Sequence, residues 1–429
     1  MPKHPTFLPG RRRRALLATL VTASAAAAAV LPSPAAADFL PAGTSDPVLA
    51  WYDATTQAIG QTGWANAGNT QIAASRAWAI SWGAADQAIA ALPPTLKGRA
   101  RAAATTTALV TALYDTLSSL VPQTTGDLRT LRRKTLSAVP GNPAKLVGRA
   151  AGDKAAAEQL TARDKDGLYL PLVNAPFTPP ASGIGVFSNP GAVQAGQGNA
   201  KPFLVPDVAN RFLAAPPPAL DSPTEIADLQ EVDAYGSKTS KARSIDQTSI
   251  ATFWSQTSVN GFVAILREVI KGVSKPIAPR VHLISVFHRA TIDEQIAIYH
   301  AKYVYLRWRP ITALTVDDEN PATPLDPSFV PLLNTPNHPE YPSGHTGYAG
   351  AAQAVLTALV GPKPLAPITV TSTASPNYYR TYTQWSQITQ DNIDARVWEG
   401  VHLRSTDVYS AGLGGQIAAA ALRNAAVRR

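Results

Sequence analysis

The chain has 429 residues, of which 45% are hydrophobic and 16% charged, enough for one large domain or two closely packed ones. It contains no cysteine, which excludes disulfide bonds, thiolate catalysis and cysteine-ligated metals. The net charge is +9, but five of the 38 basic residues precede residue 38, so the rest of the chain carries 33 basic against 29 acidic residues, or +4. The basic residues are scattered, and a nucleic-acid partner is not indicated.

Residues 1–37 have the composition of an export signal peptide. Four arginines at 11–14 precede an apolar run over residues 15–31, and an Ala-x-Ala pattern ends at Ala37. The arginine cluster resembles a twin-arginine signal. An uncleaved membrane anchor is the alternative, although the run is short for a span of ~20 residues. No later stretch is apolar enough to cross a bilayer, so we expect a secreted, extracytoplasmic protein.

The rest of the chain has mainly helical periodicity. Apolar residues recur at three- and four-residue spacing, and they predict helices over 47–59, 70–92, 96–121, 127–139, 143–162, 225–235, 245–254, 262–273 and about 280–309. Residues 167–223 are instead rich in proline and glycine. We expect a long loop there, with short extended pieces at 169–173 and 203–205.

One short stretch, His338-Pro-Glu-Tyr-Pro-Ser343-Gly344-His345, has the residue types of an anion site. The apolar residues after it predict a helix that ends before Gly361, so Ser343 and Gly344 lie at the N-terminus of that helix. Backbone N–H groups there lack helical partners and the helix dipole is positive, so an oxyanion can bind. Gly344 permits a close approach because it has no Cβ. Taken alone, the stretch is also explained by an N-cap serine and a surface histidine.

Two other segments contain cations. Lys302 and Arg309 are seven residues apart, two turns and roughly 10 Å along one helix face. Pro310 disfavours α geometry at Arg309, which is therefore expected near a helix end. Arg396 and His402 follow in a third segment. Together with the Ser-Gly helix start, these residues can form a site for a tetrahedral oxyanion; surface salt bridges are the alternative.

The ordered pattern Lys-x6-Arg-Pro, Pro-Ser-Gly-His, Arg-x5-His resembles the superfamily of vanadium-dependent haloperoxidases and type 2 phosphatidic acid phosphatases, over roughly residues 281–415. The resemblance implies that the oxygens of vanadate, or of phosphate in the same site, are bound by Lys302, Arg309, Ser343, Gly344 and Arg396. It implies that His402 ligates the vanadium of vanadate, or attacks phosphorus in a phosphatase. His345 would be the acid–base residue on the opposite, apical side.

Two residues receive supporting roles from the resemblance. His338, seven residues before His345, stands where bromoperoxidases of the superfamily have a histidine and chloroperoxidases an aromatic residue. It favours bromide or iodide over chloride. Asp293, nine residues before Lys302, is assigned to orienting the site arginines, with a solvated carboxylate as the alternative.

Two positions depart from the pattern. Ala395 precedes Arg396 where many members have serine, and Asp407 follows His402 one position later than expected. A straight helix also places residues six apart about 120° from a common face. Gly400 can relax the backbone between Arg396 and His402.

Three functions are consistent with these residues. The first is a secreted vanadate-dependent haloperoxidase that oxidises a halide with hydrogen peroxide to hypohalous acid, which then acts on a small organic acceptor. The second is a secreted acid phosphatase that hydrolyses phosphate esters through a phosphohistidine. The third is a non-catalytic oxyanion-binding protein.

We expect an all-α fold of two packed helical bundles with the Pro/Gly-rich loop region between them. The expected boundaries are a signal peptide at 1–37, an N-terminal bundle with the loop region at 38–220, and a C-terminal bundle with the oxyanion site at 221–429.

Overall fold

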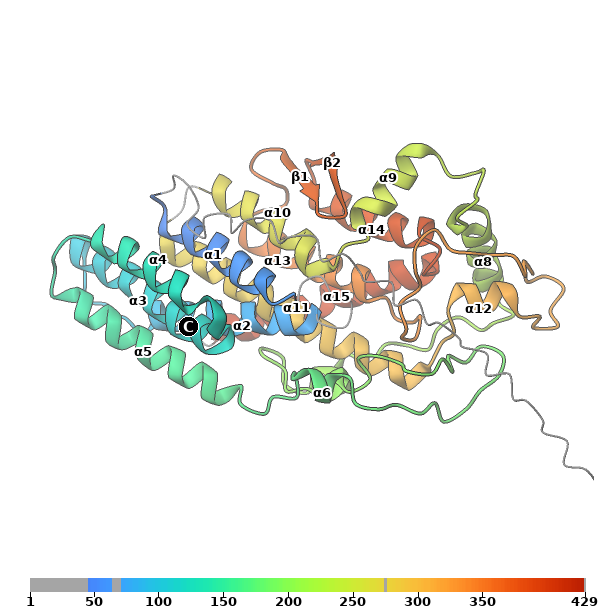
Figure 1. The fold of residues 1–429 in the computed structure, drawn as a ribbon, viewed down its shortest axis with the longest axis horizontal. Coiled ribbons are helices and arrows are strands. Elements are labelled where there is room, and N and C mark those ends of the chain that lie inside the picture. Colours follow the sequence, from blue (N-terminus) through green and yellow to red (C-terminus); the bar gives the residue numbers. More distant parts are fainter. Residues whose placement is uncertain (1–44, 64–70, 274–275, 428–429) are drawn as a thin grey trace, which may run out of the picture. The chain divides into compact units, whose positions relative to one another are not determined.

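The computed structural model describes residues 45–63, 71–273 and 276–427, so the predicted signal peptide at 1–37 lies outside the described residues. The described residues form one compact unit. Helices dominate it, as predicted, and Figure 1 shows their arrangement.

The first group of helices packs closely because small residues face one another. A Cβ placed on Gly152 would lie 2.6 Å from Cβ of Thr111, so α3 and α5 approach at a distance that only glycine allows. Asp46 caps the first helix by accepting hydrogen bonds from the backbone N–H groups of Val48 and Leu49. The group consists of α1 (Pro47–Gln61), α2 (Gln71–Ala90), α3 (Gly98–Leu120), η1 (Pro122–Thr124), α4 (Thr125–Ser137) and α5 (Ala144–Ala162).

The Pro/Gly-rich connection contains only short helical elements, which are α6 (Leu170–Val173), η2 (Gln197–Asn199) and α7 (Val208–Arg211). The prediction of extended structure at 169–173 was wrong, because α6 forms one helical turn there. Residues 203–205 form no strand either. The Asp293 carboxylate accepts hydrogen bonds from all three of their backbone N–H groups, at 2.5–2.8 Å. A side chain thus replaces the strand partner that a sheet would provide.

The second group is built around one buried helix, α11. It contacts α2 of the first group as well as α13 and α15, and the main hydrophobic core contains residues from both groups. Buried residues of α11 lie on every side of the helix, as in helices that are buried completely. The group consists of α8 (Pro223–Gly236), α9 (Ile245–Trp254), α10 (Ser258–Gly272), α11 (Ile277–Tyr305), α12 (Pro310–Thr315), α13 (Gly344–Leu359), α14 (Trp385–Trp398) and α15 (Arg404–Val427).

One hairpin interrupts the helices. β1 (Ile368–Ser372) pairs antiparallel with β2 (Ser375–Tyr382), and Ile368 lies opposite Tyr382. β1 alternates buried and exposed residues and contacts α10, so its inner face extends the core. This hairpin was not predicted.

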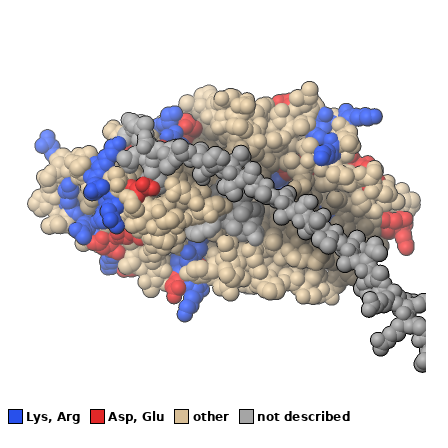
Figure 2. Space-filling model, viewed as in Figure 1, with Lys and Arg blue, Asp and Glu red and all other residues tan. Residues whose placement is uncertain are grey.

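The surface carries charges of both signs. On the face in Figure 2, basic side chains are densest over α3–α5 but stand beside acidic ones, as in the Arg149–Asp153 pair at 3.6 Å. Within the described ranges, no helix combines the length and the apolarity that are required to span a bilayer.

Candidate oxyanion site

The end of α11 places the first two cations. Leu306 adopts a left-handed conformation with φ 50° and ends the helix, so Arg309 lies beyond it in extended backbone at the N-cap of α12. This agrees with the predicted effect of Pro310, although the helix ends four residues earlier than expected. Lys302 is in the last turn of α11, is 0% exposed, and donates from Nζ to the carbonyl oxygens of Pro339 and Glu340 at 2.7 and 2.9 Å.

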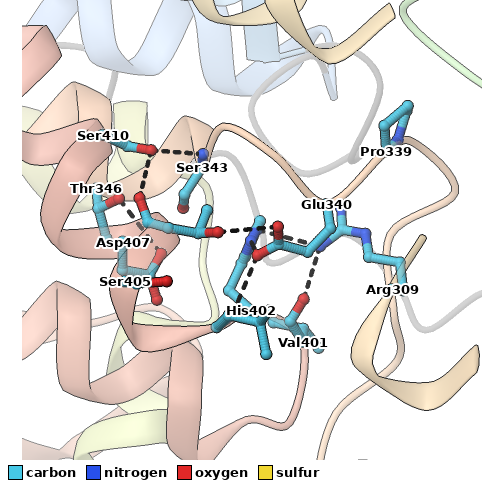
Figure 3. Close-up of polar contacts among 12 residues, drawn as sticks. Arg309, Pro339, Glu340, Ser343, Thr346, Val401, His402, Ser405, Asp407 and Ser410 are labelled. Carbon is cyan, nitrogen blue, oxygen red and sulfur yellow. Dashed lines mark hydrogen bonds and ion pairs between the residues drawn. The ribbon is translucent and has the colours of Figure 1, made fainter. Parts of the chain in front are cut away.

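Arg309 joins the three sequence motifs. Its Nε donates to the His338 carbonyl at 2.8 Å, its Nη2 lies 3.0 Å from Nδ1 of His338, and its Nη1 donates to the Val401 carbonyl at 2.8 Å. The same Nη1 is 3.1 Å from Nε2 of His402 (Figure 3). Burial lowers the pKa of Arg309 to about 10, opposed by Glu340, so the guanidinium stays charged at neutral pH.

Glu340 determines the state of His402. Its Oε1 accepts hydrogen bonds from Nδ1 of His402 at 2.9 Å and from the Leu403 N–H at 3.1 Å, and its Oε2 accepts from Oγ1 of Thr406 at 3.0 Å. The proton of His402 therefore resides on Nδ1, and Nε2 presents a lone pair. Arg309, which can only donate, is the present partner of that lone pair.

Burial, followed by the charges of Arg309 and Lys302, holds the pKa of His402 well below its usual range, so the imidazole is neutral. Burial also raises the pKa of Glu340, but the hydrogen bond from the Leu403 N–H and the two cations oppose this effect. A neutral imidazole whose Nε2 carries a lone pair instead of a proton is the form that binds a metal centre or attacks phosphorus.

The start of α13 leaves polar groups for a ligand. Ser343 is at the N-cap, but its hydroxyl does not cap the helix, and its backbone N–H donates to Oγ of Ser410 at 2.8 Å. The hydroxyl is buried, forms no hydrogen bond of full geometry, and lies beside Asp407. Burial raises the pKa of Asp407 well above its usual range, and the Ser343 hydroxyl opposes this. Ser343 therefore occupies the predicted N-cap position but lacks the side-chain hydrogen bond of an ordinary cap.

The packing of the surrounding protein does not require a glycine at position 344. A Cβ there would lie 3.6 Å from the nearest atom, in the Tyr299 ring, which is ordinary contact. The Gly344 backbone can approach a ligand in the cavity that it lines.

Arg396 and His402 come from the two sides of a helix break. Arg396 is in the last turn of α14, is 4% exposed, and forms an ion pair with Glu399. Gly400 then has a φ of 79°, which turns the chain toward His402 before α15 begins. The two residues therefore do not lie on one straight helix, and the predicted relaxation at Gly400 is confirmed.

A cavity of about 570 Å³ opens at these residues. Site residues in its wall are Tyr299, His338, Gly344, His345, Arg396, Glu399 and His402. His345 donates from Nε2 to the Gln256 carbonyl at 3.1 Å, and burial, followed by the Arg396 charge, lowers the pKa of His345 to about 3. His345 is therefore neutral, with its Nδ1 lone pair available.

Asp293 does not orient the site arginines. Its carboxylate accepts the three backbone hydrogen bonds from residues 203–205, and the charged side chain that acts on its pKa is Arg163. It is 0% exposed, so the solvated alternative is wrong as well. Asp293 anchors the Pro/Gly-rich connection to α11.

Glu340 and Glu399 are site residues that we did not predict. Both lie inside the sequence motifs, but nothing in the chain order indicates that Glu340 contacts His402, 62 residues away.

Known proteins share one domain match and the overall fold with this chain. Residues 282–428 match the family model described as the VCPO second helical-bundle domain. The fold is similar to the first bacterial vanadium-dependent iodoperoxidase, with 21% identity and a TM-score of 0.68 over 87% of this chain and 95% of that chain. A holo-type bacterial vanadium-dependent chloroperoxidase has 16% identity and a TM-score of 0.67 over 87% and 96%.

The apo-type chloroperoxidase has 16% identity and a TM-score of 0.63 over 84% of this chain and 95% of that chain. None of the curated proteins matches the sequence. Residues 282–428 therefore resemble a VCPO helical-bundle domain, and the chain as a whole shares the fold of bacterial vanadium-dependent haloperoxidases.

Proposed function

We propose that the protein is a secreted, vanadate-dependent haloperoxidase that uses hydrogen peroxide to oxidise bromide or iodide, in preference to chloride, to hypohalous acid. One observation carries this proposal: the Nε2 lone pair of His402 is held by Glu340 within a cluster of buried cations. Such a cluster needs an anion, and a lone pair beside it provides a ligand for the central atom of that anion.

The residues fit vanadate on three further counts. Lys302, Arg309 and Arg396 provide three positive charges, each at most 4% exposed. The Ser343 hydroxyl lacks a well-formed hydrogen bond, and the Gly344 backbone borders the cavity. When bound, vanadate would provide a Lewis-acidic centre that activates hydrogen peroxide toward halide.

The protein side chains have separate tasks in this proposal. His402 would hold the vanadium through Nε2, and Arg309, whose Nη1 now lies 3.1 Å from that atom, would donate to an oxygen of the anion. Lys302 and Arg396 stabilise negative charge in a site from which water is largely excluded. His345, neutral because of its lowered pKa, accepts a proton from hydrogen peroxide at Nδ1.

His338 supports the proposed halide preference. It lines the cavity, its Nδ1 is 3.0 Å from Nη2 of Arg309, and its Nε2 is 3.4 Å from the Tyr299 hydroxyl. A polar imidazole therefore lines the cavity at the position where the sequence resemblance implies an aromatic side chain in chloroperoxidases.

An acid phosphatase is the second candidate. The pairing of His402 with Glu340 also orients an imidazole for attack on phosphorus, with His345 near the leaving group. The two functions use the same anion site. In a haloperoxidase the bound vanadate would be a cofactor, whereas in a phosphatase the bound phosphate ester would be the substrate.

The test uses purified protein that has been stripped of anions and titrated with orthovanadate. Oxidation of iodide, bromide and chloride by hydrogen peroxide is measured beside hydrolysis of an aryl phosphate by vanadate-free protein. We expect halide oxidation that increases with vanadate, is lost in His402→Ala, and remains in His300→Ala, a histidine that does not line the cavity. Phosphate hydrolysis that vanadate only inhibits would instead establish the phosphatase.

A further inference from the structure

Glu399 occupies an unusual place in the oxyanion site. Its side chain is 1% exposed, and the residue lines the cavity together with His402 and Arg396. Its Oε2 forms the ion pair with Arg396, one turn earlier on α14. Its Oε1 is buried and has no hydrogen-bond partner. An unpartnered buried carboxylate oxygen is costly, so a ligand that donates a hydrogen bond to it would be stabilised.

Within the described part of the chain, no residue donates a hydrogen bond to this oxygen of Glu399. Around the cavity, α11 contributes Tyr299 and the neighbouring segments contribute His338, His345 and His402. Burial lowers the pKa of each of these three histidines, so they are neutral. The more deeply buried Lys302 and Arg309 donate to carbonyl oxygens and histidine nitrogens. Arg396 is the charged group that contacts Glu399 directly.

We propose that Glu399 is a specificity-determining residue that accepts a hydrogen bond from a hydroxyl group of the bound oxyanion. The pocket then selects tetrahedral oxyanions that still carry a proton, such as hydrogen vanadate and hydrogen phosphate, over fully deprotonated ones such as sulfate. This inference rests on the proposed oxyanion function and adds the class of anion that the site accepts.

The selection has a simple electrostatic origin. A hydroxyl of hydrogen vanadate or hydrogen phosphate donates to Oε1, and a charge-assisted hydrogen bond forms. Sulfate has no hydrogen to donate, so its oxygen would meet the carboxylate oxygen in a buried site where repulsion is poorly screened. Arg396 cannot compensate, because Glu399 already neutralises part of its charge.

The test compares two anions of equal charge and similar size. At about pH 8 inorganic phosphate is mainly a dianion with one hydroxyl, and sulfate is a dianion with none. Burial raises the pKa of Glu399 to about 7, so the carboxylate is ionised under this condition. Binding of each anion to the anion-free protein is measured by calorimetric titration.

We expect the wild-type protein to prefer phosphate over sulfate by ~10-fold or more, the factor expected for one hydrogen bond to a charged group. In Glu399→Gln the preference should fall to about threefold or less, mainly because sulfate binds more tightly to an uncharged side chain whose amide can donate. Glu231→Gln is the matched control, because Glu231 pairs with Arg404 outside the cavity lining. It should leave the preference unchanged.

Several outcomes would overturn this inference. Equal binding of sulfate and phosphate to the wild-type protein would do so without any variant, and so would an unchanged preference in a folded Glu399→Gln protein. Thermal unfolding establishes that each variant is folded. If vanadate-dependent halide oxidation is present but the anion preference is absent, the role of Glu399 alone is wrong. If the wild-type protein binds neither phosphate nor vanadate, the proposed function fails as well.

Discussion

At the scale of single residues, the site depends on which nitrogen of His402 carries its proton. Glu340 fixes that proton on Nδ1 and simultaneously accepts from the Leu403 N–H and the Thr406 hydroxyl. The carboxylate therefore positions both the imidazole ring and the first turn of α15. Groups that hold a metal-binding histidine in this way commonly affect affinity as strongly as some direct ligands.

Replacing Glu340 should weaken vanadate binding through His402. We expect Glu340→Ala to raise the Kd for vanadate by roughly 10–100-fold, because Nδ1 loses its acceptor and the tautomer is no longer fixed. Glu340→Gln should have a smaller effect, since its amide oxygen can still accept from Nδ1. Equilibrium dialysis with vanadate measures both, and wild-type affinity in Glu340→Ala would contradict the positioning role.

His345 should take up a proton when an anion binds. Its pKa is lowered to about 3 by burial and then by the charges of Arg396, Lys302 and Arg309. A bound anion offsets those charges and favours the imidazolium, so the pKa rises and protons are absorbed. Calorimetric titration with phosphate at about pH 6, in buffers of different ionisation enthalpy, measures this uptake. It should decrease in His345→Gln, and an identical uptake in that variant would assign the proton elsewhere.

At the scale of elements, helix ends bring the three motifs together. α11 ends at a left-handed Leu306, α13 begins at Ser343, and α14 breaks at Gly400, which has a φ of 79°. A Cβ on Gly400 would lie 2.6 Å from the Gly236 carbonyl oxygen and 2.9 Å from Cβ of Pro331. Both its backbone conformation and its neighbours therefore require glycine.

Gly400→Ala should damage stability and anion binding together. We expect a loss of ~1–3 kcal/mol in the free energy of unfolding from backbone strain and contact. Vanadate affinity should also fall, since the Val401–His402 segment shifts. Gly412→Ala on α15 is the matched control, because nothing lies within 4 Å of the added Cβ. Chemical denaturation and vanadate titration check both, and a neutral Gly400→Ala would contradict the role of this break.

Many of the helices could be predicted from the sequence, in their order along the chain. The segment 245–254 was predicted with the bounds that α9 has, because a capping serine and apolar periodicity mark it. The anion-binding roles stay predictions from the spaced motifs, but the structure does join these motifs, because Arg309 contacts His402 and Lys302 donates to the Pro339 carbonyl. Contacts between distant segments were not predictable: Asp293 with residues 203–205, and Glu340 with His402, depend on the packing of separate helices.

At the scale of the whole molecule, the site concentrates charge that the rest of the protein must tolerate. Burial lowers the pKa of Lys302 well below its usual range, and the neighbouring Arg309 lowers it further. Glu340 partly offsets these cations, but without an anion their repulsion opposes folding. The protein is therefore expected to be more stable when an oxyanion is bound.

Vanadate and phosphate should raise the melting temperature of the anion-free protein. At a concentration about 100 times Kd, binding stabilises the folded state by ~2.7 kcal/mol, which corresponds to several degrees in a protein of this size. Calorimetric scans with and without each anion measure the shift. His402→Ala should reduce the vanadate shift more than the phosphate shift, because phosphorus gains no ligand from a histidine in reversible binding. If vanadate raised the melting temperature of His402→Ala as much as that of the wild-type protein, vanadium ligation by His402 would be contradicted.

The Asp293 anchor divides the Pro/Gly-rich connection into two parts. Residues 203–205 are bonded to α11, the helix that also carries Tyr299 and Lys302, whereas Val193 and Gln194 earlier in the connection line the cavity. Lengthening or replacing the chain before residue 203 would therefore change the cavity wall near Val193 and Gln194. The α11 residues of the site would keep their positions. The segment before residue 203 can therefore vary in sequence and length, because the residues that follow it stay attached to α11 through Asp293.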